Sequence, residues 1–313
     1  MGRVITFLSR NATVLLAVGV LTGLALPALA TVMRPLLAPS VWGLLVIALL
    51  RVDLAGLTVQ ARRPALWGAA VVWILLLAPV IAWIAVGQAP LAPGIAAAVV
   101  LMAGTSPMTS SPALAMLVGL NGALALLLMV VATALMPFIL PLFALHVLDL
   151  PLAISPLEFS LRLAAFIASA LVAALAGRAL WRRRAGRGPA GGLHPWGDAG
   201  SVVLLLVFAV GIMQGVAARL LAEPAFILGV VALAFAGYGA LLLAGTVLFR
   251  AWGQDGALTV GFISANRNMA ILLAVLPADV DPDVTLYLAI GQIPMYVMPA
   301  LLLPLYRRII TPS

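Results

Sequence analysis

The 313-residue sequence contains no cysteine, which excludes disulfides, thiolate metal ligands and cysteine nucleophiles. It also contains no lysine, so all 17 basic residues are arginines. Charged residues make up 8% of the chain, against about 25% in typical soluble domains. Hydrophobic residues make up 65%, and the mean hydropathy is +1.24. A water-soluble globular protein is therefore excluded, and the sequence predicts an all-α integral membrane protein.

Apolar runs long enough to cross a bilayer occur ten times along the chain. A hydrocarbon core of about 30 Å needs about 20 residues of helix. The first run follows Arg3 and Arg10 and ends in Ala28-Leu29-Ala30, as a cleavable signal peptide does, but it is long for a signal core and further apolar runs follow it. We therefore expect ten transmembrane helices, at residues 11–31, 38–58, 66–86, 93–119, 122–146, 157–180, 199–221, 224–249, 256–277 and 283–306.

The arginines indicate the orientation of these helices, because basic residues collect in short cytoplasmic loops. With a cytoplasmic N-terminus, the outer loops contain only Arg34 and Arg219. The inner segments contain Arg3, Arg10, Arg62, Arg63, Arg178, Arg182, Arg183, Arg184, Arg187, Arg250, Arg307 and Arg308. This bias explains the net charge of +8 without nucleic acid binding. Since the composition is typical of a GC-rich prokaryotic genome, we expect a multi-pass protein of the cell inner membrane with both termini in the cytoplasm.

A polar stretch at residues 181–198 divides the chain into two halves of five helices each. It is rich in glycine and arginine, and we expect a flexible cytoplasmic loop there. An odd number of helices in each half places two equivalent halves in opposite orientations. That is the inverted-repeat architecture common among secondary transporters.

Two of the predicted helices are interrupted near their centres. The fourth contains the polar run 103–112 with Pro107 and Pro112, and the ninth contains Ser264-Ala265-Asn266-Arg267-Asn268. Proline removes a backbone donor and clashes with the preceding turn, so the freed carbonyl groups need other partners. The interruptions lie about 157 residues apart, about half the chain. Paired interruptions in matching positions point to a transporter binding site, although a packing kink explains the first run equally well.

Arg267 is the most costly of the residues in these interruptions. An arginine at the bilayer centre costs about 2.5–3.5 kcal/mol even on the translocon scale. No aspartate or glutamate occurs in the middle of any apolar segment. Its partners are therefore expected among hydroxyls, carbonyls, water and an anionic solute. We predict that the solute is bound by Thr105, Ser106, Thr109, Ser110, Ser111, Ser264, Asn266, Arg267, Asn268 and Gln292.

The same residues resemble the bile acid:sodium symporter family over nearly the whole chain. The resemblance is carried by Gly104-Thr105 through Pro112, Leu120-Asn121-Gly122-Ala123-Leu124, Met136-Pro137 with Pro141, and Leu258-Thr259-Val260-Gly261 leading to Asn266. It implies two inverted five-helix repeats in which helices 4 and 9 are broken and cross. It also implies a panel part at residues 11–58 and 157–221 and a core part at residues 66–146 and 224–306, with solute bound beside the crossing and contacted by Thr109 and Asn266.

The sodium ligands of that family are mostly missing. By resemblance, their positions correspond to Ser111-Pro112, Ala125, Met129, Gly261, Ala265 and Trp73 or Ile74, so only Ser111 keeps a side-chain ligand. A sodium ion about 5 Å from Arg267 would be repelled by about 3 kcal/mol at an effective dielectric of 20. We therefore expect no metal site and a transporter that works without sodium.

The predicted function is secondary active or facilitative transport of a small organic anion by alternating access, with Arg267 as a fixed positive charge. A sodium-coupled symporter of a bile-acid-like or organic-acid solute and a membrane sensor that does not transport are the alternatives. An intramembrane enzyme is disfavoured, because no cysteine, histidine or carboxylate lies deep in a segment. We expect no cofactor, the lipid bilayer and the solute as partners, and a monomer or homodimer.

Several other polar residues have a structural and a functional interpretation. Glu158 and Arg162 are spaced as an intrahelical ion pair, and Glu158 is also the one candidate proton carrier. Gln214, Gln292 and Tyr296 are expected either to line the cavity or to form interhelical hydrogen bonds. Arg51 and Asp53 are expected to pair at the membrane interface, and His146 and His194 are expected to be solvated.

Overall fold

The computed structural model describes residues 12–52, 54–142, 144–145, 154–185, 194–277 and 279–310. Helices account for nearly all of this part of the chain, and it contains no β-strand. Asp53, His146, Asp149 and residues 186–193 lie outside the described ranges, as do Arg3 and Arg10. The predictions made for these residues are therefore not addressed by the structure.

Among the described residues, seven helices are long and apolar enough to cross a membrane, so the chain is a multi-pass helical membrane protein. They comprise Pro27–Leu50, Pro64–Val86, Gly122–Leu142, Pro156–Arg184, Ala199–Ala222, Pro224–Leu248 and Pro282–Ile310. These correspond to the predicted segments 2, 3, 5, 6, 7, 8 and 10. Segments 1, 4 and 9 do not form one uninterrupted long helix within the described residues.

The first predicted segment differs from the structure because of one proline. Helix α2 (Ala12–Ala25) ends before Leu26, whose φ of −124° and ψ of 75° are not helical. Pro27 lacks an amide hydrogen and disfavours a helical conformation in the residue before it. Helix α3 (Pro27–Met33) then continues through the 3₁₀ turn η1 (Arg34–Leu36) into α4 (Leu37–Leu50). The second membrane helix therefore begins about ten residues earlier than the sequence predicts.

The predicted flexible loop at residues 181–198 is helical at both of its ends. Helix α11 (Pro156–Ala185) extends through Arg182, Arg183 and Arg184 in its last turn, and α12 (His194–Gly211) begins at the histidine. Arginine is a good helix former, and positive side chains are favourable at a helix C-terminus. The helix-forming tendency of these arginines outweighs the polarity that suggested a loop.

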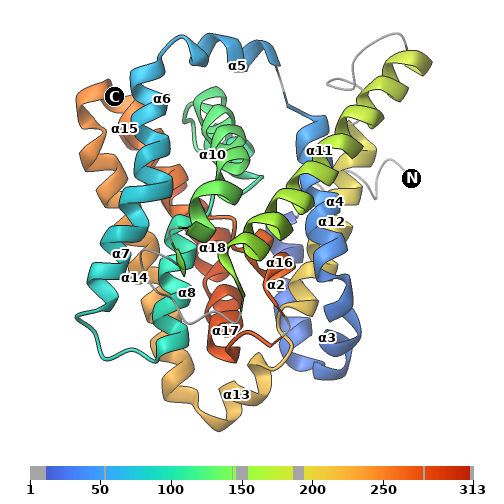
Figure 1. Ribbon diagram of the computed structural model, residues 1–313, viewed down its shortest axis with the longest axis vertical. Helices are drawn as coiled ribbons and strands as arrows, with labels where there is room; N and C mark the ends of the chain where they lie inside the picture. The colour runs from blue at the N-terminus through green and yellow to red at the C-terminus, as the bar shows by residue number, and fades with distance from the viewer. Residues whose placement is uncertain are drawn as a thin grey trace. The chain divides into compact units, whose positions relative to one another are not determined.

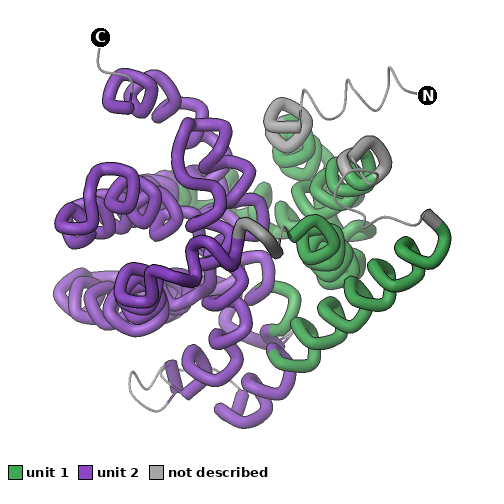
Figure 2. Tube along the Cα trace, turned by 90° about the horizontal axis from the view of Figure 1, so that it is seen from above, with its two compact units in different colours: residues 1–53, 164–227, 273–275 green, residues 54–163, 228–272, 276–313 purple. Residues whose placement is uncertain are grey.

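The chain divides into two compact units, coloured separately in Figure 2. Unit 1 comprises residues 1–53, 164–227 and 273–275, and unit 2 comprises residues 54–163, 228–272 and 276–313. Unit 1 is held together by contacts of α12 with α2, α3 and α4. In α2, Gly23 allows close approach of the backbones, because a Cβ atom there would lie 2.6 Å from the Val210 carbonyl oxygen of α12.

An arginine caps the C-terminal end of one helix in unit 1. The Arg178 guanidinium donates to the carbonyl oxygens of Leu49 at 2.8 Å and Val52 at 2.7 Å. These carbonyls lie at and just beyond the end of α4, where the last helix turn has no intrahelical donors. Arg178 therefore caps α4 from the neighbouring helix α11.

Unit 2 contains the elements that form the candidate site. It begins with α5 (Leu54–Ala61), α6 (Pro64–Val72), the π-helical turn η2 (Trp73–Leu77) and α7 (Ala78–Val86). The short helices α8 (Pro93–Gly104) and α9 (Ser111–Leu117) follow, and then α10 (Gly122–Leu142). Its later elements include α15 (Gly253–Ala265), α17 (Pro282–Ile290) and α18 (Gln292–Ile310), together with all but the first four residues of α14 (Pro224–Leu248) and the first four residues of α16 (Met269–Val275). Helix α8 packs beside α7 and α17 (Figure 1).

The series α8–α9–α10 and α15–α16–α17 have the same order and nearly the same spacing. Helices α8 and α15 have 12 and 13 residues, and α9 and α16 have 7 each. The residue before the third helix contacts the start of the other series in both cases. The Asn121 side-chain amide donates to the Asp255 carboxylate at 3.0 Å. A Cβ atom added to Gly94 would lie 2.6 Å from the Asp281 carboxylate. The two interruptions therefore occupy equivalent places along the chain.

Candidate functional site

The fourth predicted segment is interrupted between α8 and α9, where the sequence predicts a break. Helix α8 ends at Gly104, and Thr105 is extended, with φ of −73° and ψ of 159°. Pro107 follows two residues later and has no amide hydrogen to continue the helix. Helix α9 begins at Ser111 and has Pro112 in its first turn, a position that proline favours.

The ninth predicted segment is interrupted between α15 and α16. Asn266 and Asn268 lie outside the helical region, with ψ angles of 82° and 64°. The Met269 amide donates to the Arg267 carbonyl at 3.0 Å, which closes a γ-turn centred on Asn268. The chain is thus non-helical for three residues before α16 begins.

The two interruptions are joined by backbone hydrogen bonds. The Met108 amide donates to the Asn266 carbonyl and the Asn268 amide donates to the Ser106 carbonyl, both at 2.8 Å. These bonds form an isolated antiparallel bridge between Pro107 and Arg267. Pro107 occupies a position from which no amide donation is required, so a proline fits the bridge. Irregular backbone inside a membrane protein must find such partners, because lipid offers none.

Arg267 lies at the centre of this crossing and is 0% exposed. Its Nε donates to the Ser264 carbonyl at 2.6 Å. Its Nη1 donates to the carbonyls of Ile74 at 3.0 Å and Thr105 at 2.8 Å. The guanidinium therefore connects the ends of α8 and α15 with the π-helical turn η2, using backbone oxygens alone.

Each of these three carbonyls lacks a helical donor for a local reason. Ser264 lies in the last turn of α15, and Thr105 follows the last residue of α8. Ile74 lies in η2, where the Ala78 amide bonds to Trp73 instead. In this register the amide that would reach Ile74 belongs to position 79, which is a proline without an amide hydrogen.

These carbonyls also explain how a buried arginine is tolerated. The C-terminal end of a helix carries about half a negative charge, and two such ends face Arg267. Backbone oxygens thus provide partners for Nε and Nη1. The Arg267 Nη2 atom is buried and has no hydrogen-bond partner among the described residues.

Three further buried polar atoms have no partner in the described part of the chain. These are Asn266 Oδ1, Asn268 Nδ2 and the Tyr287 hydroxyl. The other side of the Asn266 amide is satisfied, because its Nδ2 donates to the Tyr238 hydroxyl at 3.1 Å and to the Phe262 carbonyl at 2.7 Å. Buried polar groups without partners are uncommon in proteins, so each needs an explanation, such as local strain, a bound water, an ion or a ligand. Three of the four atoms belong to the consecutive residues 266–268.

The remaining predicted site residues have different environments. Thr105, Ser106, Ser111 and Ser264 are fully buried, whereas Thr109 is half-buried and Ser110 is exposed. The Ser106 hydroxyl accepts a bond from Thr133 at 3.1 Å. The predicted serines thus help to hold the crossing together.

Ser264 and Gln292 are also engaged by protein groups. The indole of Trp73 donates to the Ser264 hydroxyl at 2.8 Å, and that hydroxyl donates to the Val260 carbonyl at 2.7 Å. Gln292 accepts a bond from the Tyr296 hydroxyl at 2.9 Å. The sequence prediction did not include Tyr238 and Tyr287. The only available signal for them was a tyrosine within an apolar segment.

The positions that resemble sodium ligands do not form a cation site through their side chains. Gly261 cannot be replaced by an acidic ligand, because a Cβ atom would collide with the Thr246 hydroxyl and lie 2.7 Å from the Leu242 carbonyl. Ala125, Met129 and Ala265 are buried and provide no oxygen ligand. No group of acidic or histidine side chains suited to a metal ion occurs among the described residues. Among the side chains at these positions, only the Ser111 hydroxyl therefore offers an oxygen ligand.

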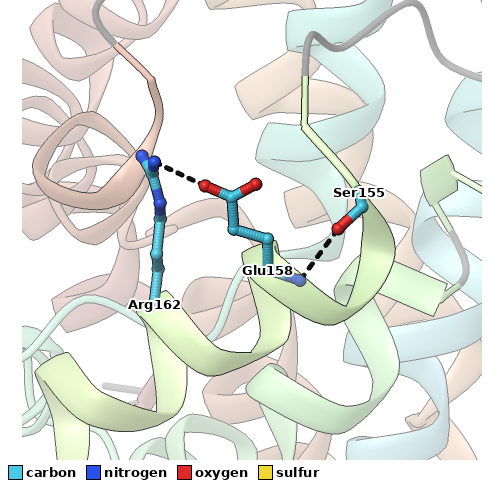
Figure 3. A network of polar contacts seen from close by, with 3 residues as sticks. All are labelled: Ser155, Glu158 and Arg162. Atoms are coloured by element: carbon cyan, nitrogen blue, oxygen red, sulfur yellow. Dashed lines mark hydrogen bonds and ion pairs between the residues drawn. The ribbon is translucent and has the colours of Figure 1, made fainter.

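Glu158 and Arg162 form the predicted intrahelical pair, as Figure 3 shows. Arg162 donates to the Glu158 carboxylate at 2.6 Å, and the Ser155 hydroxyl accepts from the Glu158 amide at 3.2 Å. The serine caps the start of α11. Both charged side chains are about half exposed, at 43% and 51%. Surface pairs of this kind contribute at most about 0.5 kcal/mol, so the pair has a structural explanation.

Gln214 lies in the turn that follows α12 in unit 1. It accepts a hydrogen bond from the Arg34 guanidinium at 2.9 Å.

The comparisons with known proteins do not identify a family. No family model matches the chain, and no curated protein is detectably similar to it.

Proposed function

We propose that this protein is a secondary transporter of a small organic anion and that it works without sodium. The observation that supports this most directly is the crossing of two interrupted helices, where the buried Asn266 Oδ1, Arg267 Nη2 and Asn268 Nδ2 have no partner among the described residues. Interrupted helices in matching positions are the usual means by which transporters build a binding site within the bilayer.

The polar atoms at the crossing favour an anion. Arg267 Nη2 and Asn268 Nδ2 are both donors, and the only formal charge within the two interruptions is that of Arg267. A carboxylate accepts from both kinds of donor, and charge-assisted hydrogen bonds are stronger than neutral ones. A carboxylate about 4 Å from the guanidinium gains about 4 kcal/mol at an effective dielectric of 20 before desolvation. That corresponds to about millimolar affinity, which suits a carrier that must also release its solute.

Sodium independence follows from the same arginine. The side chains that correspond to sodium ligands are absent except for Ser111, and a fixed guanidinium binds the carbonyl oxygens instead. A nearby sodium ion would be repelled by this charge. The retained Ser111 hydroxyl lies 3.5 Å from the Asn266 carbonyl and leaves the sodium-coupled alternative with one ligand.

The two units support a model of alternating access. The resemblance to the bile acid:sodium symporter family implies an inverted repeat with a core part and a panel part. We assign unit 2, which contains both interruptions, as the core part and unit 1 as the panel part. The repeated spacing of α8–α9–α10 and α15–α16–α17 supports the inverted repeat. In this proposal both termini are cytoplasmic.

The test uses purified protein reconstituted in proteoliposomes. A panel of radiolabelled monocarboxylates and dicarboxylates is screened by counterflow, with sodium or choline as the only cation. We expect uptake of at least one carboxylate to be equal in both cations. Uptake that requires a sodium gradient favours the sodium-coupled alternative, and ligand binding without any flux favours the membrane sensor.

Charge dependence is tested with two matched substitutions. Arg267→Gln removes the charge at the crossing, and Arg162→Gln removes a charge from the exposed pair on α11. We expect carboxylate binding to weaken at least about 10-fold in the first variant and to be unchanged in the second. Equal effects of the two substitutions would contradict the proposal that Arg267 attracts the solute.

A further inference from the structure

The three carbonyl oxygens around Arg267 have the chemistry of a cation site. Ile74, Thr105 and Ser264 come from three separate elements, and their oxygens lie 2.6–3.0 Å from two guanidinium nitrogens. Arg267 and the three residues that supply these oxygens are all 0% exposed. No carboxylate hydrogen-bonds to the guanidinium in the described part of the chain. Backbone oxygens converging on one positive charge are also the ligand set that hard cations prefer.

The local structure keeps these oxygens available whether or not the arginine is present. Each one lacks a helical donor. The Ile74 oxygen lacks one because of the π register and Pro79. The Thr105 and Ser264 oxygens lack one because α8 and α15 end there. The ends of α8 and α15 add partial negative charge on the same side. An unsatisfied buried carbonyl costs free energy, so all three need a positive or donating partner.

From this geometry we infer that the oxygens of Ile74, Thr105 and Ser264 form a site for a monovalent cation, and that the protein's own Arg267 side chain permanently occupies it. The arginine thus acts as a covalently attached cation that assembles the crossing. Removing it is expected to create a protein whose folded state depends on a free cation. This inference concerns assembly of the crossing, so it stands even if the transported solute differs from an organic anion.

The test compares thermal stability of detergent-purified wild type and Arg267→Ala. The alanine variant lacks the atoms of an ethylguanidinium ion, so ethylguanidinium is the first probe, followed by sodium and potassium, with choline as the bulky control. We expect the variant to melt at a lower temperature than wild type. Ethylguanidinium or sodium at millimolar concentration is expected to raise its midpoint by about 3 to 6 °C and to leave wild type unchanged. Arg162→Ala should show no cation response.

Two further variants decide the question if the alanine protein cannot be purified. Arg267→Lys keeps a positive charge with three donors, and Arg267→Gln keeps hydrogen-bonding capacity without charge. We expect the lysine variant to be folded and insensitive to cations, and the glutamine variant to be less stable. The inference is overturned if the glutamine variant is as stable as wild type, or if a purified alanine variant gains the same stability from choline as from sodium and ethylguanidinium.

Discussion

The side-chain nitrogen of Asn268, which has no partner among the described residues, gives the sharpest test of whether the crossing is a binding site. We expect Asn268→Leu to stabilise the ligand-free protein while weakening solute binding. Asn268 is 3% exposed, and its Nδ2 has no partner among the described residues. An unsatisfied buried donor costs about 1–3 kcal/mol, and leucine has a similar size without this cost. The midpoint of thermal unfolding in detergent should therefore rise by about 2 to 6 °C.

The opposite effect is expected on binding. If Asn268 Nδ2 donates to the solute, its loss removes about 1.4 kcal/mol or more of interaction, which is about a 10-fold loss of affinity. The assay titrates the best transported carboxylate and measures its affinity by thermal shift and by inhibition of counterflow. A variant that gains stability and loses affinity identifies a group kept for binding at a cost in stability.

A matched control is Asn266, which lies two residues earlier in the segment between α15 and α16. Asn266→Leu makes the same chemical change, but the Asn266 amide donates two hydrogen bonds, to the Tyr238 hydroxyl and the Phe262 carbonyl. This variant should be destabilised by about 1–3 kcal/mol, because both acceptors lose a buried partner. A binding role for Asn268 would be contradicted if Asn268→Leu lowered stability as much as Asn266→Leu, or left affinity unchanged.

Two further predictions concern packing and capping in the two units. Gly261→Ala should destabilise unit 2 by about 1–3 kcal/mol, because the added methyl group meets α14, whereas Gly229→Ala, with open space around it, should be neutral or stabilising; thermal unfolding in detergent compares the two. Arg178→Ala should lower the free energy of unfolding by about 1–3 kcal/mol, because two carbonyls at the end of α4 lose their donor. The exposed Arg182→Ala should change it by no more than about 0.5 kcal/mol, and equal losses would show that capping does not explain the effect.

Much of the membrane architecture could be predicted from the sequence, because long apolar runs have few alternative structures. The two interruptions were also predictable, since Pro107 and Pro112 prevent a regular helix and Arg267 is costly in a continuous one. The break at Leu26 was missed because Pro27 lies within an apolar run of a length suited to one span. The ends of α11 and α12 were missed because glycine and arginine were interpreted as a loop signal.

The partners of Arg267 were predictable only as a class. Carbonyl oxygens were among the expected partners, but the sequence did not indicate which ones. The Ile74 carbonyl is free because of the π register in η2, and a single local window of apolar residues does not reveal that register. The burial of Tyr287 could not be predicted at all, because it depends on how α17 packs beside α8. Long-range packing of this kind leaves no mark in hydrophobic periodicity.

The proline at position 79 has a consequence for how such a crossing can originate. An ordinary residue there would supply one extra amide proton, which is positioned to compete with the guanidinium for the Ile74 oxygen. Binding of the Arg267 guanidinium to the Ile74 oxygen thus depends on the amide hydrogen that Pro79 of α7 lacks. A lineage that acquired the arginine before this proline would have placed the new charge beside a carbonyl oxygen that already had a helical donor.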